Sequence, residues 1–143
     1  MLNRIVVINS ALYAKANLHL GDAESIQLAA ENNVGKSSLI NCLNFLYILD
    51  KREWKFGDNT ASETIKHYFK TVEQSYVVFE IVKDGYYCIV VKRAVEKEDL
   101  DYCIIQHAYE DEMFFKREGD TVEPLKFKDV VGNLTRRGIP VKP

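Results

Sequence analysis

The chain has 143 residues, of which 47% are apolar and 28% are charged, and its formal net charge is −2. These values are typical of one globular domain that is large enough to bury a core without disulfides or metal ions. The small net charge gives no general reason to expect a nucleic-acid ligand, although it does not exclude a local basic patch. The apolar run from Ile5 to Ile8 is far too short for a signal peptide or a membrane span, so we expect a cytoplasmic protein without a membrane partner.

The cysteines Cys42, Cys88 and Cys103 form no CxxC pair and have no metal-binding spacing with histidines. Each lies in an apolar run, which predicts small buried side chains in a reducing compartment. The histidines are also separated from one another in the sequence, so they are expected to be ordinary surface or core residues.

The first third of the chain predicts strands that lead to a helix. The β-branched run Ile5–Ile8 predicts a buried strand, and the alternation over residues 18–20 predicts a half-exposed one. A second alternation over residues 26–28 leads into the segment AENNVGKSS. After that segment, residues 36–49 carry apolar side chains at helical spacing, which predicts a largely buried helix.

The middle of the chain predicts a second helix and a hairpin. Thr60 is followed three residues later by Glu63, which is a capping-box signature, and apolar positions continue from Ile65 to Val72. The segments SYVVFEIVK and YYCIVVKR flank Asp84 and Gly85. A two-residue Asp-Gly between β-branched runs predicts a hairpin with a type I′ turn.

The last part of the chain predicts further strands and a terminal helix. Residues 102–109 and 113–116 are expected to form another antiparallel pair, so that antiparallel strands extend over about residues 75–117. A short helix is expected over about residues 127–137, ended by the glycine and proline that follow it. The order of these elements predicts a mixed α/β arrangement without the regular βαβ alternation of a complete doubly wound domain.

Residues 30–37 match the P-loop pattern of Gly or Ala, four residues, Gly-Lys, and then Ser or Thr. In such a loop the backbone N–H groups enclose a phosphate, and the following helix directs its positive N-terminal end at the anion. We therefore predict a nucleotide site whose phosphate-binding residues are Ala30, Glu31, Asn32, Asn33, Val34, Gly35, Lys36, Ser37 and Ser38.

The residue types within this motif predict separate roles. Lys36 is expected to reach the β- and γ-phosphates of ATP as the catalytic cation, and the Ser37 hydroxyl is expected to ligate Mg²⁺. Gly35 lets the backbone approach the phosphate closely, and Ser38 adds a hydroxyl contact on the α-phosphate side. Ala30 stands where glycine is usual, which restricts the backbone at that position and is expected to lower the affinity for nucleotide.

The segment NNVGKSSLINCLNFLYI resembles the P-loop and following helix of SMC-like ATPases, the group that includes the RecF and RecN repair proteins. The resemblance is strongest to bacterial SMC-like subunits of defence systems such as Lamassu. It extends upstream over RIVVINSALYAKANLHL and downstream over FKTVEQSYVVFEIVKDGYYCIVVKR, and so covers the chain to about residue 116.

The resemblance implies an α/β P-loop NTPase of the ABC type, in which residues 1–143 form the N-terminal lobe of an ATPase head. The C-terminal half of such a head carries the ABC signature and the Walker B acidic pair, and two heads enclose two ATP molecules. The implied partners are that C-terminal half, a second head, DNA and accessory subunits, in DNA repair, chromosome maintenance or defence against phages and plasmids. This sequence has no heptad region, no LSGGQ-like signature and no Walker B strand with paired carboxylates. As it stands, the chain is therefore expected to bind ATP and Mg²⁺ but to hydrolyse ATP poorly.

Two other functions remain as alternatives. The first is a non-catalytic interaction module, either gated by nucleotide or purely structural. The second is a stand-alone kinase or GTPase, which the absence of guanine-reading and acidic catalytic motifs disfavours.

Other apparent motifs have simpler explanations. Asp50 ends a Walker B-like segment that lies on the predicted helix, and Glu80 lies in the middle of a strand, where an exposed sheet face is expected to explain it. The DxxG match from Asp129 to Gly132 lacks an NKxD partner, and Gln106 lies within a strand pattern, not in a Q-loop. A basic group near the end of the chain is expected to be a solvated helix face rather than a DNA contact: Lys126, Lys128, Arg136, Arg137 and Lys142.

Overall fold

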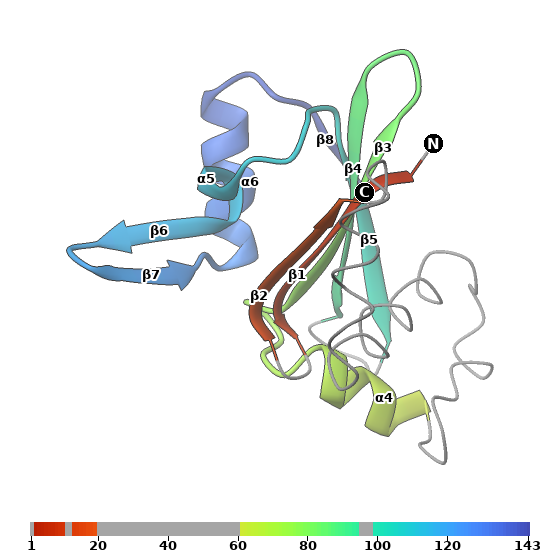
Figure 1. The fold of residues 1–143 in the computed structure, drawn as a ribbon, viewed down its shortest axis with the longest axis vertical. Helices are drawn as coiled ribbons and strands as arrows, with labels where there is room; N and C mark the ends of the chain where they lie inside the picture. The colour runs from red at the N-terminus through yellow and green to blue at the C-terminus, as the bar shows by residue number, and fades with distance from the viewer. Residues whose placement is uncertain (1, 11–12, 20–60, 95–98) are drawn as a thin grey trace.

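The computed structural model of the protein describes residues 2–10, 13–19, 61–94 and 99–143 (Figure 1). The strands in these ranges are β1 (Leu2–Ser10), β2 (Tyr13–His19), β3 (Tyr76–Val82), β4 (Tyr86–Arg93), β5 (Leu100–Ile105), β6 (Phe115–Glu118), β7 (Thr121–Pro124) and β8 (Val141–Lys142). The helices are α4 (Ala61–Tyr68), α5 (Asp111–Phe114) and α6 (Phe127–Arg136). Six strands form an antiparallel sheet in the order β2-β1-β3-β4-β5-β8, and β6 pairs with β7 in a separate two-stranded ribbon.

The predicted hairpin in the middle of the chain is confirmed, but the predicted two-residue turn is wrong. Val82 pairs with Tyr86, so Lys83, Asp84 and Gly85 together form the loop between β3 and β4. Asp84 (φ 53°) and Gly85 (φ 132°) do have the positive φ angles that the Asp-Gly pair indicated. Because side chains alternate with a period of two along a strand, the extra loop residue decides which side chains share a face of the sheet.

The predicted second helix is confirmed as α4, but α4 ends at Tyr68, so Phe69 and Val72, which the prediction placed on the helix, follow it. The Ile65, Tyr68 and Phe69 side chains are buried, and the Phe69 N–H donates to the Ile65 carbonyl at 2.8 Å beyond the last helical residue. Thr60, the predicted cap, lies outside the described residues. The apolar positions at helical spacing thus correctly indicated the face of α4 that packs against the sheet.

Both faces of the sheet are buried. One face, which we call the α4 face, packs against α4 in a cluster that contains Ile5, Val7, Ile65, Tyr68, Phe69, Val77, Phe79, Val91 and Leu100. The other face, which we call the α6 face, packs against α5 and α6 in a larger cluster that contains Val6, Ile8, Tyr76, Val78, Cys88, Val90, Cys103, Ile105, Tyr109, Met113, Phe114, Leu125, Val130 and Leu134. The near-continuous apolar runs of β1 and β3 follow from this two-sided burial.

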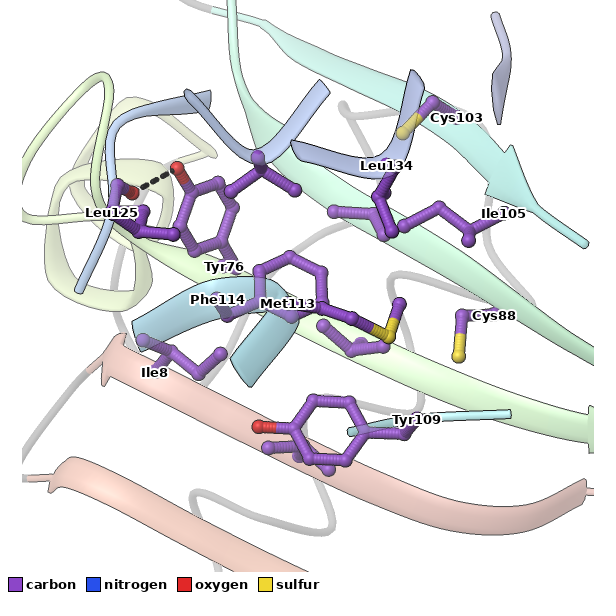
Figure 2. Packing of buried hydrophobic residues seen from close by; sticks show 14 residues of the cluster. Ile8, Tyr76, Cys88, Cys103, Ile105, Tyr109, Met113, Phe114, Leu125 and Leu134 are labelled. Atoms are coloured by element: carbon purple, nitrogen blue, oxygen red, sulfur yellow. Dashed lines mark hydrogen bonds between the residues drawn. The ribbon is translucent and has the colours of Figure 1, made fainter. Parts of the chain in front are cut away.

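Tyr76 is at the centre of the contacts on the α6 face (Figure 2). Its ring lies 5.3 Å from the ring of Phe114 and 6.3 Å from that of Phe127, measured between centroids. Its hydroxyl lies 2.7 Å from the Leu125 carbonyl and 2.6 Å from the Glu73 carbonyl, both of which are acceptors. Burial raises the pKa of Tyr76, so this hydroxyl remains a neutral donor that fixes the segments before β3 and α6.

The predicted pairing of residues 102–109 with residues 113–116 is wrong. β5 pairs with β4 and β8, whereas residues 111–114 form the short helix α5 and β6 turns back to pair with β7. Gly119, with φ of 59°, forms the tight turn of this ribbon together with Asp120. This Gly-Asp turn signal lies in the sequence, but the prediction placed the turn at residues 110–112 instead.

The predicted terminal helix is confirmed as α6, with Arg137 as its C-cap. The Gly138 N–H donates to the Thr135 carbonyl and the Ile139 N–H donates to the Leu134 carbonyl, which is the hydrogen-bond pattern of a Schellman motif. Gly138 has φ of 71°, a left-handed conformation that glycine adopts without a side-chain clash. The helix therefore ends where the glycine predicted.

The α/β P-loop class and the assignment of residues 1–143 to one lobe of an ATPase head remain predictions. The described residues form a mostly antiparallel β structure with few helices. Residues 20–60, which include the predicted P-loop and the helix after it, lie outside them.

Candidate functional site

The predicted nucleotide site lies outside the described residues and remains a prediction from sequence. This applies to Ala30, Glu31, Asn32, Asn33, Val34, Gly35, Lys36, Ser37 and Ser38, and also to Cys42 and Asp50. In the sequence, the motif stands between β2, which ends at His19, and α4, which begins at Ala61.

The most buried acidic side chain in the described part of the chain belongs to Glu80 on β3, and only 2% of this residue is exposed. The expectation that an exposed sheet face explains Glu80 is therefore wrong. That expectation assumed that one face of the sheet is solvated, whereas both faces are covered at β3. The signal was present in the sequence, because a glutamate inside the continuous apolar run YVVFEIV indicates a strand buried on both sides.

The Glu80 carboxylate connects three segments of the chain. Its Oε1 accepts a hydrogen bond from Asn3 Nδ2 at 2.6 Å, and its Oε2 accepts one from the Tyr109 backbone N–H at 2.8 Å. Arg4 Nε lies 3.6 Å from Oε1, which supplies an opposite charge. The register of β1 against β3 shifts between Leu2 and Arg4, and this irregularity allows both Asn3 and Arg4 to reach the same carboxylate. With both oxygens accepting protein hydrogen bonds, Glu80 is a structural carboxylate and not a free base.

A second polar cluster surrounds Tyr109. Its ring stacks on Phe114 with 5.8 Å between centroids and an interplanar angle of 14°, and the Arg4 guanidinium carbon lies 5.9 Å from the Tyr109 ring centroid. The Tyr109 hydroxyl donates to Asp111 Oδ1 at 3.0 Å, and Lys15 Nζ lies 2.7 Å from Asp111 Oδ2. Burial raises the pKa of Tyr109, so the tyrosine stays neutral.

Asp111 is held in its charged form. Burial alone would raise the pKa of Asp111, but the hydrogen bonds from Lys15 and Tyr109 outweigh this effect and hold the pKa below its usual value. Because Lys15 belongs to β2 and Asp111 to α5, the ion pair connects one edge of the sheet to the helix that precedes the ribbon.

Asn9 adopts a left-handed backbone conformation near the end of β1. Its φ of 49° places it in the left-handed region, which non-glycine residues seldom adopt. The Ser75 hydroxyl donates to the Asn9 carbonyl at 2.7 Å, and Asn9 Nδ2 donates to Thr71 Oγ1 at 3.1 Å. These bonds fix the end of β1 against the connection between α4 and β3.

Cys88 and Cys103 are buried free thiols, as the sequence indicated. Burial raises the pKa of Cys88 to about 12 and that of Cys103 to about 11, so both are protonated at neutral pH. Cys88 Sγ donates to the His107 carbonyl at 3.4 Å. Protonated buried thiols are poor nucleophiles and poor metal ligands, which leaves packing as their role.

A cleft of about 460 Å³ lies beside the other edge of the sheet. It is lined by residues of β4, β5, α6 and β8 and by the last residue of the chain: Lys92, Asp101, Tyr102, Cys103, Phe127, Val131, Val141 and Pro143. Lys92 Nζ lies 4.8 Å from the Phe127 ring centroid and 3.5 Å from Asp101 Oδ2. The lysine charge is thus already balanced by an aromatic face and a carboxylate.

The remaining residues that the sequence pointed to do not come together in one site. Asp129 and Gly132 both lie within α6, which supports a chance match to the GTPase motif. Gln106 follows β5, is exposed, and donates its backbone N–H to the Pro140 carbonyl at 3.1 Å. No group of three or more His, Cys, Asp or Glu side chains suited to a metal ion occurs among the described residues.

Part of the basic group near the end of the chain is already ion-paired. Arg137 Nη2 lies 2.8 Å from Glu110 Oε1, and this contact lowers the pKa of Glu110. Lys126 Nζ lies 4.0 Å from Glu73 Oε2, and Arg136 donates to the Asn133 side-chain carbonyl. The interpretation of this group as a solvated helix face remains a prediction.

None of the helices within the described ranges has the length and apolar composition that a membrane span requires.

Comparisons with models of protein families, with curated proteins and with solved structures found no match to this chain.

Proposed function

We propose that the protein binds Mg-ATP through residues 30–37 and forms the N-terminal half of the ATPase head of an SMC-like protein that acts on DNA. The observation that carries this proposal is the motif AENNVGKS, placed after an alternating apolar segment and before an apolar segment of helical period. A strand before the loop and a helix after it are what phosphate binding requires.

The chemistry of the proposed site is electrostatic. Lys36 and a Mg²⁺ ion held through Ser37 would stabilise negative charge on the β- and γ-phosphates, and backbone N–H groups of residues 31–35 would surround the β-phosphate. The carboxylate that activates water and the signature motif would come from a C-terminal half of the head. Turnover by this chain alone is therefore expected to be negligible.

The described sheet adds limited support. Residues 76–93, which lie in the segment that resembles the antiparallel strands of the family, do form an antiparallel hairpin with a buried core on both faces. Because antiparallel hairpins occur in many folds, the main support for the proposal is the P-loop motif of residues 30–37. The proposed partners are the C-terminal half of the head, a second head and DNA, and the proposed location is the cytoplasm.

The proposal is tested by titration calorimetry of the 143-residue chain with Mg-ATP. Charged hydrogen bonds to phosphate contribute about 1.5–3 kcal/mol each, so Lys36→Ala is expected to weaken binding at least about tenfold. Ser37→Ala is expected to weaken the dependence of ATP binding on Mg²⁺. Lys128→Ala removes an exposed lysine of α6 and serves as the matched control with unchanged affinity.

The outcomes separate the two leading functions. Saturable binding that is at least about tenfold weaker in Lys36→Ala but unchanged in Lys128→Ala supports the half-head. Equal affinity in Lys36→Ala and the parent chain would exclude the P-loop assignment. A folded parent chain without any affinity for ATP would favour a structural interaction module that does not use nucleotide.

A further inference from the structure

The ribbon formed by β6 and β7 is the most exposed part of the described structure. Figure 1 shows it extending to one side of the sheet, beyond α5 and α6. Six of its eight strand residues are exposed, and the other two, Phe115 and Pro124, are half-buried. Two-stranded hairpins are marginally stable in water, and a third strand or a packed face stabilises them.

The outer edge of β6 has unpaired backbone groups. The Leu125 N–H donates to the Phe114 carbonyl at 2.7 Å, so residues 114 and 125 form a hydrogen-bonded pair. Because bonded and non-bonded pairs alternate in an antiparallel ladder, the pairs Phe115–Pro124 and Arg117–Val122 are non-bonded, and their N–H and C=O groups point outward. Pro124 agrees with this alternation, because a residue of a non-bonded pair donates no N–H to the partner strand and proline has no N–H.

Three groups on this edge can accept a new strand. The Phe115 N–H already donates to the Asp111 carbonyl, which leaves the Phe115 C=O and both the N–H and C=O of Arg117. Within residues 2–10, 13–19, 61–94 and 99–143, no strand other than β7 pairs with β6.

A groove of about 580 Å³ lies along this region. It is lined by one residue of β2 together with residues of α5 and the ribbon: Lys15, Asp111, Glu112, Phe115, Lys116, Arg117 and Val122. Its apolar lining residues are Val122, which is 50% exposed, and Phe115, which is half-buried against the α6-face cluster and has Lys15 Nζ 5.6 Å from its ring centroid. Phe115, Arg117 and Val122 lie on the same face of the ribbon, because Arg117 and Val122 are paired and Phe115 is two residues from Arg117.

Some of the charged residues that line the groove are ion-paired and others are not. Lys15 is neutralised by Asp111 at 2.7 Å, and Lys116 is neutralised by Glu118 at 2.9 Å. Arg117 and Glu112 are exposed and have no ion-pair partner in the part of the chain that the structure describes. The groove thus offers an unpaired positive charge on β6 and an unpaired negative charge on α5, with the apolar surface of Phe115 between them.

From this arrangement we infer that the β6 edge binds an extended protein segment of the pattern acidic, any, apolar, any, basic, as an added antiparallel strand. The acidic residue pairs with Arg117 and exchanges two backbone hydrogen bonds with it. The apolar residue, two positions later, donates its N–H to the Phe115 carbonyl and packs on the Phe115 ring. The basic residue, two positions further on, reaches Glu112. The charge order sets the direction of the segment, and the backbone bonds set its register.

The inference is tested with a fluorescein-labelled nonapeptide, TTETVTKTT, titrated against the 143-residue chain by fluorescence anisotropy. The expected affinity is on the order of 100 µM, since a single added strand buries little area. The charge-reversed peptide TTKTVTETT is expected to bind about fivefold more weakly, because exposed ion pairs contribute modestly. Methylation of the peptide nitrogen of its glutamate removes a donor to the Arg117 carbonyl and is expected to weaken binding about tenfold.

Variants of the protein test the assignment of the charges. The double substitution Arg117→Glu and Glu112→Lys is expected to reverse the preference, so that TTKTVTETT becomes the better ligand. Lys83→Glu, at the tip of the β3–β4 loop and distant from the ribbon in Figure 1, is the matched control with unchanged affinities. Circular dichroism establishes that each variant is folded.

Each alternative result overturns the inference. If the folded chain shows no saturable binding up to about 1 mM peptide, which is about ten times the expected dissociation constant, the edge does not bind a strand of this kind. Equal binding of the two peptides, or an unchanged preference in the double variant, means that the charges do not direct it. A dimer of the parent chain that the double variant abolishes means that a second copy occupies the edge. Nucleotide binding is not involved in these measurements, so their failure leaves the proposed function untouched.

Discussion

The side chain of Glu80 connects β1, β3 and the segment before α5 through a single carboxylate. Asn3 and the Tyr109 backbone donate hydrogen bonds to it, and Arg4 supplies the opposite charge. A buried carboxylate is costly to desolvate, and it is retained only where donors and a counter-charge offset that cost. Removing the carboxylate leaves those partners buried without their acceptor.

Glu80→Ala is therefore expected to lower the free energy of unfolding by about 3 kcal/mol. The loss combines an unpaired Arg4 charge, two unsatisfied donors and a small cavity. Urea unfolding followed by circular dichroism measures it. Glu118→Ala, which removes an exposed carboxylate of the ribbon, is the control and is expected to change stability by less than about 1 kcal/mol. A loss of under about 1 kcal/mol in Glu80→Ala would show that the buried network contributes little.

Single residues also show where sequence reasoning succeeds and where it fails. The burial of Cys88 and Cys103 followed from their apolar surroundings, because a local pattern determines it. The burial of Glu80 did not follow from its alternating neighbours, because it depends on α5 and the Tyr109 segment, which are distant in the chain. The apolar run around Glu80 was the available signal.

Among the elements, those with strong local signals were predicted best. The helices α4 and α6 and the hairpin of β3 and β4 were all located, because capping residues, helical periodicity and an Asp-Gly turn are local features. The three-residue loop, by contrast, was not predicted, since a two-residue and a three-residue loop share the same Asp-Gly signal. The pairing of β5 with β4 and β8 depends on strand order, which local patterns do not determine.

Two glycines of the same region provide a test of how α6 ends. Gly138 has φ of 71°, whereas Gly132 lies inside α6, and a Cβ added to either residue would meet no neighbouring atom within 4 Å. Gly138→Ala is expected to lower the free energy of unfolding by about 1 kcal/mol, because alanine is strained at positive φ. Gly132→Ala is expected to raise it by up to about 1 kcal/mol through helix propensity.

Thermal unfolding of the two variants against the parent chain measures these opposite effects. Because neither added methyl group meets a neighbour, the difference isolates the backbone conformation. Equal destabilisation by both substitutions would contradict the left-handed conformation at Gly138.

For the whole molecule, the described sheet buries both faces and encloses the Glu80 carboxylate on an inner strand. The Glu80 and Tyr109 clusters are near β1, and the Lys92 cleft and the ribbon groove flank opposite edges of the sheet. The proposed ATP site was predicted entirely from sequence, because a P-loop is a contiguous motif with its own chemistry. The proposed strand-binding edge could not be predicted in that way, because it depends on the pairing register of β6 and β7.

The most direct test of the central claim is the melting temperature of the chain measured against increasing Mg-ATP. A ligand that binds only the folded state, present at about a hundred times its dissociation constant, adds about 2.7 kcal/mol of stability, which corresponds to a rise of roughly 5–10 °C for a chain of this size. The account predicts this rise for the parent chain and for Lys128→Ala, and a rise that is smaller by at least about half for Lys36→Ala, because a tenfold weaker ligand adds only about 1.4 kcal/mol at the same concentration. An equal rise in Lys36→Ala, or no rise in the parent chain, would contradict it.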